Sequence, residues 1–339
     1  MTRLYACDLS PIVTSNSTEV VMIMTRAKAL SWTLSLAALC ATAFGQNANP
    51  AGPGTLNYVE GQVSIEGRPL TPQSVGNTTL QAGQTLATAN GKAEILLTPG
   101  IFVRLGNDSN VQMVSPDLTH TEVRLDRGRA NVEVDQIYPQ NTILVDLKNG
   151  QTQLLKTGLY SFDANSSTVR VFDGHAAVYP GTNPQTDIKP IEVKSGRQLA
   201  LSGEPLKPQR FNKDQAEADP LYKWSSLRSD YLGQANLNLA SEYAGYANFY
   251  PGWYWAGGPF GYTWLPGAGL FWNPFGYGFY SPWYLYGGGF VYNRGFYGRP
   301  GYGYRGAVAS AHVSEGGFHG GGFAGGGGFH GGGGGGGHR

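Results

Sequence analysis

The chain has 339 residues, a formal net charge of +1 and two cysteines. Because positive and negative charges nearly balance, no net field draws the chain to nucleic acid, and we expect no nucleic-acid partner. Both cysteines, Cys7 and Cys40, lie within the first 45 residues. A disulfide framework is therefore not expected, and the fold must depend on an apolar core and on backbone hydrogen bonds.

Residues 22–45 have the features of a secretory signal peptide. Arg26 and Lys28 form a positive segment, an uncharged apolar run follows, and Ala43-Phe44-Gly45 offers small residues for cleavage. The apolar run is short for a bilayer span, so an uncleaved membrane anchor is the less favoured alternative. We expect an exported protein of the periplasm or the outer cell surface, with no transmembrane span in the mature chain.

Two short segments flank this signal peptide. Because a signal peptide normally begins at the N-terminus, we interpret residues 1–21 as a mis-assigned start or an unstructured extension, with translation starting at Met22 or Met24. Residues 46–55 form a polar linker rich in proline and glycine. From the linker onward the chain carries 21 basic and 21 acidic residues, so the mature protein has no net charge.

Residues 56–204 consist of short runs in which apolar and polar positions alternate. In one of them Ala93, Ile95 and Leu97 alternate with Lys92, Glu94 and Leu96, as on a strand with one buried face. Asn90-Gly91, Asn149-Gly150 and Asp173-Gly174 are hairpin signals between such runs. About a dozen runs, roughly 8–12 residues apart, predict an all-β fold, either an antiparallel β-sandwich or a short β-solenoid.

The glycine and aliphatic positions of this region also follow a family pattern. The motifs are Leu80-x-x-Gly83-x-x-Leu86, Ala93-x-Ile95-x-Leu97-x-Pro99-Gly100, Val103-x-Leu105, Leu125-x-x-Gly128-x-Ala130-x-Val132 and Val169-x-Val171-x-x-Gly174-x-Ala176-x-Val178. Through them, residues 57–202 resemble the FecR-type domain, the periplasmic domain of iron-dicitrate transport regulators. Such regulators usually carry a cytoplasmic anti-sigma segment and one transmembrane helix, and they receive a signal from an outer-membrane transporter. This chain shows neither feature, so the resemblance implies the fold and a sensing or binding role without the anti-sigma role.

Residues 205–242 change to a helical period. Asp219 is a candidate N-cap and Pro220 suits the first helical position, so we predict one amphipathic helix of about 20 residues. The apolar face is predicted to contain Leu221, Trp224, Leu227, Tyr231, Leu232 and Ala235. The opposite face is predicted to carry Lys223, Arg228 and Asp230. Because that face mixes both charges, we expect the helix to pack on the β domain and not to lie on a membrane surface.

Residues 243–304 form an aromatic, low-complexity segment. It contains 25 aromatic residues in 62 positions, and its only charges are Arg294 and Arg299. Because glycine and proline are spread throughout, we expect neither a helix nor a long strand to persist. The rings could drive self-association by stacking, or form a platform for a glycan or a protein partner. The best candidates for that contact are Trp253, Trp255, Trp264, Trp272 and Trp283.

Residues 305–339 form a Gly/His-rich tail that we expect to be disordered, because 16 of the last 24 residues are glycine. Four histidines in this tail are weak candidates for binding a metal ion: His312, His319, His330 and His338. Their spacings match no closed structural site, so we expect no bound metal.

No catalytic constellation is visible in the β region. His120 and His175 lie in alternating runs, where a surface histidine is the expected role. The acidic residues Glu133 and Asp135 are expected to lie in solvent at strand edges, and we expect no cofactor. The sequence therefore predicts an exported, non-enzymatic binding or sensing module of the cell envelope that contacts a protein or glycan through its β domain and aromatic tail. The alternative is a structural surface or matrix protein that associates with itself through that tail.

Overall fold

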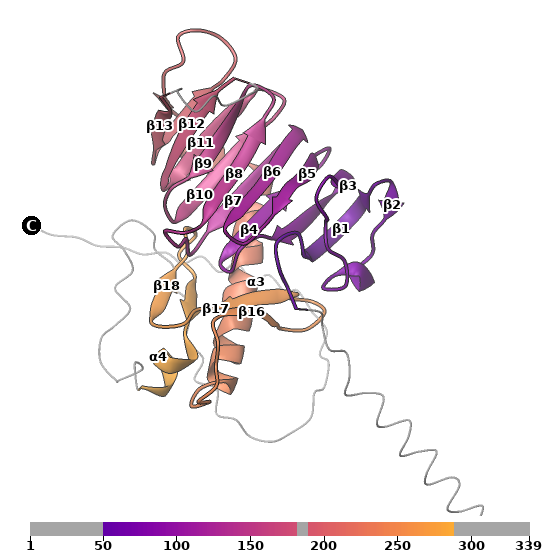
Figure 1. The fold of residues 1–339 in the computed structure, drawn as a ribbon, viewed down its shortest axis with the longest axis vertical. Helices are drawn as coiled ribbons and strands as arrows, with labels where there is room; N and C mark the ends of the chain where they lie inside the picture. Colours follow the sequence, from indigo (N-terminus) through magenta and orange to yellow (C-terminus); the bar gives the residue numbers. More distant parts are fainter. Residues whose placement is uncertain (1–49, 182–188, 288–339) are drawn as a thin grey trace, which may run out of the picture. The chain divides into compact units, whose positions relative to one another are not determined.

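The structure is a computed structural model that describes residues 50–181 and 189–287, all within one compact unit, Met1–Phe290 (Figure 1). The predicted signal peptide, the segment before it and the Gly/His-rich tail, with its four histidines, lie outside the described residues. Most of the strands precede residue 211, whereas the α-helices and two small hairpins follow it.

The region predicted to be all-β forms one sheet of 15 strands. In chain order the strands are β1 (Leu56–Ile65), β2 (Arg68–Pro69), β3 (Thr85–Leu96), β4 (Ile101–Leu105), β5 (Asn110–Pro116), β6 (His120–Arg127), β7 (Arg129–Val134), β8 (Thr142–Leu147), β9 (Gly150–Leu154), β10 (Gly158–Asp163), β11 (Thr168–Asp173), β12 (His175–Pro180), β13 (Ile191–Lys194), β14 (Arg197–Ala200) and β15 (Gln209–Arg210). A short 3₁₀ helix, η2 (Pro72–Ser74), follows β2. The predicted fold class, mostly β, is confirmed.

The long strand β3 divides this sheet into two arms. From β3 the sheet continues through β5, β6, β8, β9, β12 and β13 in one direction, and through β4, β7, β10, β11, β14 and β15 in the other. Aliphatic side chains of both arms, such as Val123 on β6 and Val132 on β7, belong to one core cluster. The two packed arms resemble a sandwich, whereas the chain steps between them as it advances, in the manner of a solenoid (Figure 1).

One strand pair departs from the antiparallel prediction. After β6 the chain crosses to β7 in the other arm and then returns as β8, so β6 and β8 pair in parallel. A parallel pair needs such a crossover, because a tight hairpin can join only antiparallel strands. The sheet is therefore mixed.

Two of the three predicted hairpin signals are wrong. Asn90-Gly91 lies inside β3, where Gly91 pairs with Gly61 of β1 next to a register shift. A Cβ atom on Gly61 would lie 2.2 Å from the Asn90 carbonyl oxygen, so the glycines permit a close backbone approach instead of a turn. Asp173-Gly174 connects β11 to β12, which belong to different arms and do not pair. Asn149-Gly150 does lie at a hairpin, between β8 and β9.

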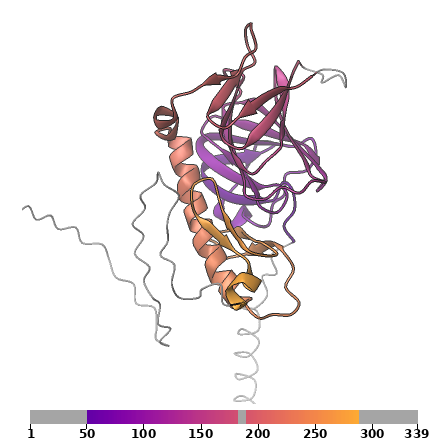
Figure 2. The ribbon, with the colours of Figure 1, turned by 90° about the vertical axis from the view of Figure 1, so that its left-hand side faces the viewer.

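The C-terminal part adds helices and hairpins to the sheet. Its elements are α2 (Lys213–Glu217), α3 (Pro220–Glu242), β16 (Gly252–Trp255), β17 (Tyr262–Leu265), β18 (Leu270–Trp272), β19 (Gly278–Tyr280) and α4 (Pro282–Tyr286). The predicted N-cap of the long helix is confirmed, because Asp219 Oδ1 accepts a hydrogen bond of 2.8 Å from the Leu221 amide. Figure 2 shows α3 running beside the sheet, with the hairpins next to the helix.

The predicted apolar face of α3 is only partly correct. Leu221, Trp224, Leu232 and Ala235 are buried, but Leu227 and Tyr231 are 50% and 44% exposed. The buried side is instead completed by Ser225, Arg228, Ser229 and Asn236. The assignment of Arg228 to the solvent face is therefore wrong, and the reason is that the sheet surface beneath the helix is itself polar.

The part of the aromatic segment that the structure describes, residues 243–287, is folded and contains the short helix α4, so the expectation that no helix persists there is wrong. Its strands have only three or four residues, but they pair as two hairpins, β16–β17 and β18–β19. Trp264 and Phe279 from these hairpins join a buried cluster with Phe102 of β4 and Leu232 of α3. The aromatic residues thus form a second core on the outer side of the sheet, which the low-complexity interpretation did not anticipate. We call residues 220–287 the C-terminal lobe.

Candidate functional site

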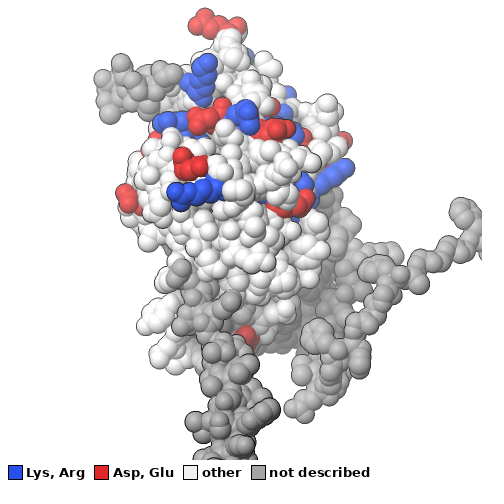
Figure 3. All heavy atoms as spheres, turned by 90° about the vertical axis from the view of Figure 1, so that its right-hand side faces the viewer, with Lys and Arg blue, Asp and Glu red and all other residues white. Residues whose placement is uncertain are grey.

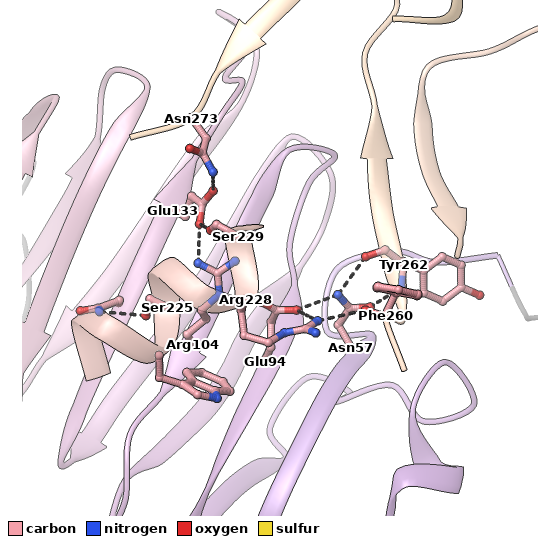
Figure 4. Close-up of polar contacts among 12 residues, drawn as sticks. Asn57, Glu94, Arg104, Glu133, Ser225, Arg228, Ser229, Phe260, Tyr262 and Asn273 are labelled. Carbon is pink, nitrogen blue, oxygen red and sulfur yellow. Dashed lines mark hydrogen bonds and ion pairs between the residues drawn. The ribbon is translucent and has the colours of Figure 1, made fainter. Parts of the chain in front are cut away.

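A buried polar seam joins the sheet to the C-terminal lobe. On the outward side of β3, β4 and β7, Glu94, Arg104 and Glu133 are each at most 1% exposed. Arg104 lies between the two carboxylates, donating from Nε to Glu94 Oε2 at 2.6 Å and from Nη1 to Glu133 Oε2 (Figure 4). Paired charges of this kind tolerate burial because each has a partner.

Side chains of the C-terminal lobe form the remaining hydrogen bonds of the seam. Arg228 of α3 donates from Nη2 to Glu94 Oε1 at 2.8 Å and to the Phe260 carbonyl oxygen at 3.0 Å. Ser229 donates its hydroxyl to Glu133 Oε2, and Asn273 donates to Glu133 Oε1 at 2.8 Å. Each carboxylate of the sheet is therefore bonded both within the sheet and to the lobe.

Two asparagine side chains form hydrogen bonds with backbone groups of the hairpins. Asn57 of β1 donates to the Tyr262 carbonyl oxygen at 3.0 Å and accepts from the Tyr262 amide at 2.6 Å. Asn236 of α3 donates to the Trp264 carbonyl oxygen at 2.8 Å and accepts from the Tyr280 amide at 2.7 Å. These side-chain amides satisfy backbone groups that short hairpins leave unpaired.

The charged groups of the seam shift each other's pKa values. Burial alone would raise the pKa of Glu94, but the attraction and hydrogen bonds of Arg228 and Arg104 outweigh burial and lower the pKa to about 2. Burial by itself would lower the pKa of Arg104, yet Glu133 and Glu94 together raise it. Both groups remain charged at neutral pH, and the seam holds three buried ion pairs, Arg104–Glu94, Arg104–Glu133 and Arg228–Glu94.

Asp135 lies buried directly after β7, and both of its carboxylate oxygens are without a hydrogen-bond partner in the described part of the chain. Burial, followed by the negative charge of Glu133, raises the pKa of Asp135 well above its usual value. The expectation that Glu133 and Asp135 lie in solvent is therefore wrong, because the C-terminal lobe covers the sheet face that carries them. The seam is closed to solvent and serves to hold the lobe on the sheet.

The five predicted contact tryptophans occupy different environments. Trp264 is 0% exposed and belongs to the second core, so its ring does not reach a partner. Trp253 and Trp255 are partly buried against the sheet, Trp253 by its indole nitrogen, 3.4 Å from the Leu97 carbonyl oxygen. Trp272 and Trp283 are exposed. The sequence could not separate these rings, because all five lie in similar aromatic surroundings.

Exposed tyrosines that the sequence analysis did not single out gather near the C-terminal end of α3. Tyr246, Tyr250 and Tyr286 are 61%, 75% and 66% exposed. The Tyr243 ring packs 5.7 Å from Tyr246, and Tyr286 lies against Gly245. Residues 243–287 contain no charged side chain. We call Tyr246, Tyr250, Trp283 and Tyr286 the ring surface.

Charge is unevenly distributed on the molecule. On the face shown in Figure 3, charged side chains gather in the upper part, whereas the surface below, at the level of the C-terminal hairpins, is almost uncharged. Large exposed rings that gather on one surface are typical of contact surfaces, because isolated soluble domains seldom retain such patches.

A cleft of about 610 Å³ lies on the outward face of β7, β10, β11 and β14, beside α2 and the first turn of α3. Its polar lining includes Arg129, Arg170 and Arg210. Phe172, Phe211 and Tyr222 provide an aromatic wall, with the Phe172 ring centroid 5.2 Å from that of Phe211 and 5.0 Å from that of Tyr222. This cleft could not be predicted from the sequence, because its residues come from five separate strands and two helices.

The remaining predicted groups form no reactive set. His120 Nε2 lies 3.3 Å from Glu122, and His175 Nε2 lies 3.4 Å from Glu192. Across residues 50–181 and 189–287, no cluster of three or more His, Cys, Asp or Glu side chains could hold a metal ion. In the same ranges no helix is both long and apolar enough to cross a bilayer.

Comparison with known proteins relates part of the chain to a family. Two crystal structures of a "putative anti-sigma factor" from Parabacteroides distasonis are similar at 12% sequence identity and a TM-score of 0.33, each covering 40% of this chain. The chain spans 62% and 63% of their length, and no curated protein matches it. Residues 84–177, from the start of β3 into β12, match the family model described as FecR protein, so this segment is a FecR domain, as its glycine and aliphatic motifs predicted.

Proposed function

We propose that the chain is an exported, non-enzymatic binding module of the cell envelope, in which the FecR domain carries a C-terminal lobe that contacts an envelope glycan. The observation that carries this proposal is the ring surface, which belongs to the uncharged segment 243–287 of the lobe. The buried seam anchors that lobe to the sheet, so the rings are presented in a fixed arrangement. Pre-organised rings lose little conformational entropy when they bind.

The chemistry of the ring surface favours a neutral glycan. Three of its four rings are tyrosines, whose flat faces cover the apolar faces of sugars while the hydroxyl tips tolerate water. No charged group of residues 243–287 is available to select a charged partner. The signal peptide predicted at residues 22–45 supports placement in the envelope.

Co-sedimentation with isolated envelopes tests the proposal. The mature chain, residues 46–339, is mixed with envelopes of the cells that make it, and the bound fraction is compared with that of a Tyr250→Ala, Trp283→Ala, Tyr286→Ala variant. We expect the variant to lose at least tenfold in affinity, because truncating an aromatic residue that anchors a binding surface costs more than about 1 kcal/mol and tenfold corresponds to about 1.4 kcal/mol. Leu118→Ala with Tyr138→Ala, at exposed positions outside the lobe, is the matched control and should bind as the wild type does.

Treatment of the envelopes identifies the partner class. Loss of binding after digestion with wall hydrolases, but not after protease, supports the glycan. Loss after protease alone replaces the glycan by a protein partner. If the chain instead forms large assemblies by sedimentation velocity, and the triple variant does not, the rings drive self-association and the structural alternative holds.

A further inference from the structure

We propose that the cleft beside α2 is a second binding site, and that it takes a small acidic sugar. The cleft lies at the N-terminal end of α3, whereas the ring surface lies at the C-terminal end of the same 23-residue helix. At 1.5 Å per residue the two are separated by roughly 30 Å, so the cleft is distinct from the surface to which the proposed function is assigned.

The charges of the cleft favour an anion. Of its two carboxylates, Asp219 forms an ion pair with Arg129, and Asp163 accepts hydrogen bonds from the backbone amides of residues 165 and 166 at 2.9 and 3.2 Å. Both acidic groups are therefore already engaged. Arg170 and Arg210 make no ion pair within the described residues, which leaves the cleft with an excess of positive charge.

Arg170 is the residue best placed to hold a carboxylate. Its side chain is half-buried on β11, and its Nε and Nη2 both donate to the neutral Gln198 side-chain oxygen, at 3.1 and 3.0 Å. The guanidinium also lies 5.1 Å from the centre of the Phe211 ring. A guanidinium that bonds a single amide oxygen with this fork would gain from a carboxylate, whose two oxygens match it and carry the complementary charge.

The rest of the lining indicates a hydroxylated ring. Neutral hydrogen-bonding groups surround Arg170, namely Asn131, Ser161, Ser166, Thr168, Gln198 and Gln215. The aromatic wall of Phe172, Phe211 and Tyr222 offers a flat apolar face. A cleft of about 610 Å³ lies within the range of small-molecule sites. An acidic sugar combines the anion, the hydroxyl groups and the apolar ring face that these three features match.

Calorimetric titration of the mature chain with D-glucuronate tests this site. D-glucose is the neutral counterpart, and inorganic phosphate is an anion without a ring. We expect saturable binding of glucuronate that is at least tenfold tighter than that of either counterpart. Arg170→Gln should weaken glucuronate binding at least tenfold, because it removes a charge-assisted hydrogen bond. Arg124→Gln, which removes one positive charge from β6 in the other arm, should leave it unchanged.

Each other outcome overturns the proposal. Equal binding of phosphate and glucuronate makes the aromatic wall irrelevant and reduces the site to a general anion site. Glucuronate binding that survives Arg170→Gln lies elsewhere, and absence of saturable binding rejects the acidic-sugar site. Thermal melting shows whether Arg170→Gln remains folded, and Arg210→Gln, on the exposed edge strand β15, provides a second variant that should weaken binding. Neither substitution should change co-sedimentation with envelopes, so this site and the proposed function can fail separately.

Discussion

Removing Arg228 should detach the C-terminal lobe from the sheet. In the seam, Glu94 and Glu133 are balanced by Arg104 and Arg228, and the side chains of Glu94 and Arg228 are 0% and 3% exposed. Arg228→Met keeps much of the side-chain volume but leaves one buried carboxylate charge without compensation. Breaking one partner of a buried ion pair lowers the free energy of unfolding by about 3–5 kcal/mol.

The assay is urea unfolding at pH 7, followed by tryptophan fluorescence. A double variant with Glu94→Gln should recover part of the loss, because it removes the uncompensated charge, and the coupling between the two positions should be about 0.5–3 kcal/mol. Arg124→Met is the matched control, because Arg124 is 46% exposed and lies 3.9 Å from Asp146, and surface pairs contribute about 0–1 kcal/mol. A loss for Arg228→Met no larger than for this control would refute the claim that the seam holds the lobe.

Three further predictions concern Glu94 and Asp135 near the seam and Trp264 in the second core. The pKa of Glu94 is lowered from 4.5 to about 2. Its contribution of about 3 kcal/mol to the free energy of unfolding is therefore present above pH 4.5 and lost as the pH falls towards 2. Urea unfolding at a series of acid pH values should show this loss of stability in the wild type and not in Glu94→Gln. The pKa of Asp135 is raised, mainly through burial, so its contribution to the free energy of unfolding is present below the usual pKa of 3.8 and lost as the pH rises. Asp135→Asn should therefore gain stability relative to the wild type on going from pH 4 to pH 8. A constant difference in stability between the two proteins across this range would contradict the raised pKa. Trp264→Ala should lower the free energy of unfolding by about 3–5 kcal/mol, because it leaves a cavity in the second core. Trp272→Ala, at an exposed ring, should lower it by about 0.5 kcal/mol or less. Similar melting temperatures for the two variants would show that the hairpins do not pack on the sheet.

The sequence was most informative where a pattern depends on neighbouring residues. Period-two alternation predicted the mostly β fold, and Asp219 with Pro220 placed the start of α3 because capping is decided within one turn. Hairpin signals were less informative. Asn90-Gly91 has the composition of a turn, but its glycine serves a close approach between β1 and β3, which no local pattern can show.

The seam could not be predicted, because its meaning depends on residues far apart in the chain. Glu94, Arg104, Glu133 and Arg228 each occupy a position where a solvent-exposed charge is the ordinary expectation. Arg104 pairs with Glu94 and Glu133 across neighbouring strands, whereas Arg228 meets Glu94 only when α3 covers the sheet, although 134 positions separate the two residues in the chain. A long helix whose apolar stripe is interrupted by Ser225, Arg228 and Ser229 was the one available sign that the surface beneath it is polar.

The aromatic lobe shows the same limit. Frequent glycine and proline correctly restrict the strands to three or four residues. Composition could not reveal that Asn57 and Asn236 satisfy the hairpin backbone, or that the rings pack on Phe102. For that reason the sequence analysis predicted the same role for Trp264 and Trp272, although Trp264 is in a core and Trp272 is at the surface.

Hydrogen exchange of residues 46–339 is the most direct test of the central claim, which is that the C-terminal lobe is an integral folded layer on the FecR domain. We expect the amides of α3 and β17 to be protected to the same degree as those of β4 and β7, and Arg228→Met to remove protection from α3 and β17 first. Exchange of the α3 and β17 amides within seconds in the wild type, while β4 and β7 remain protected, would contradict the account.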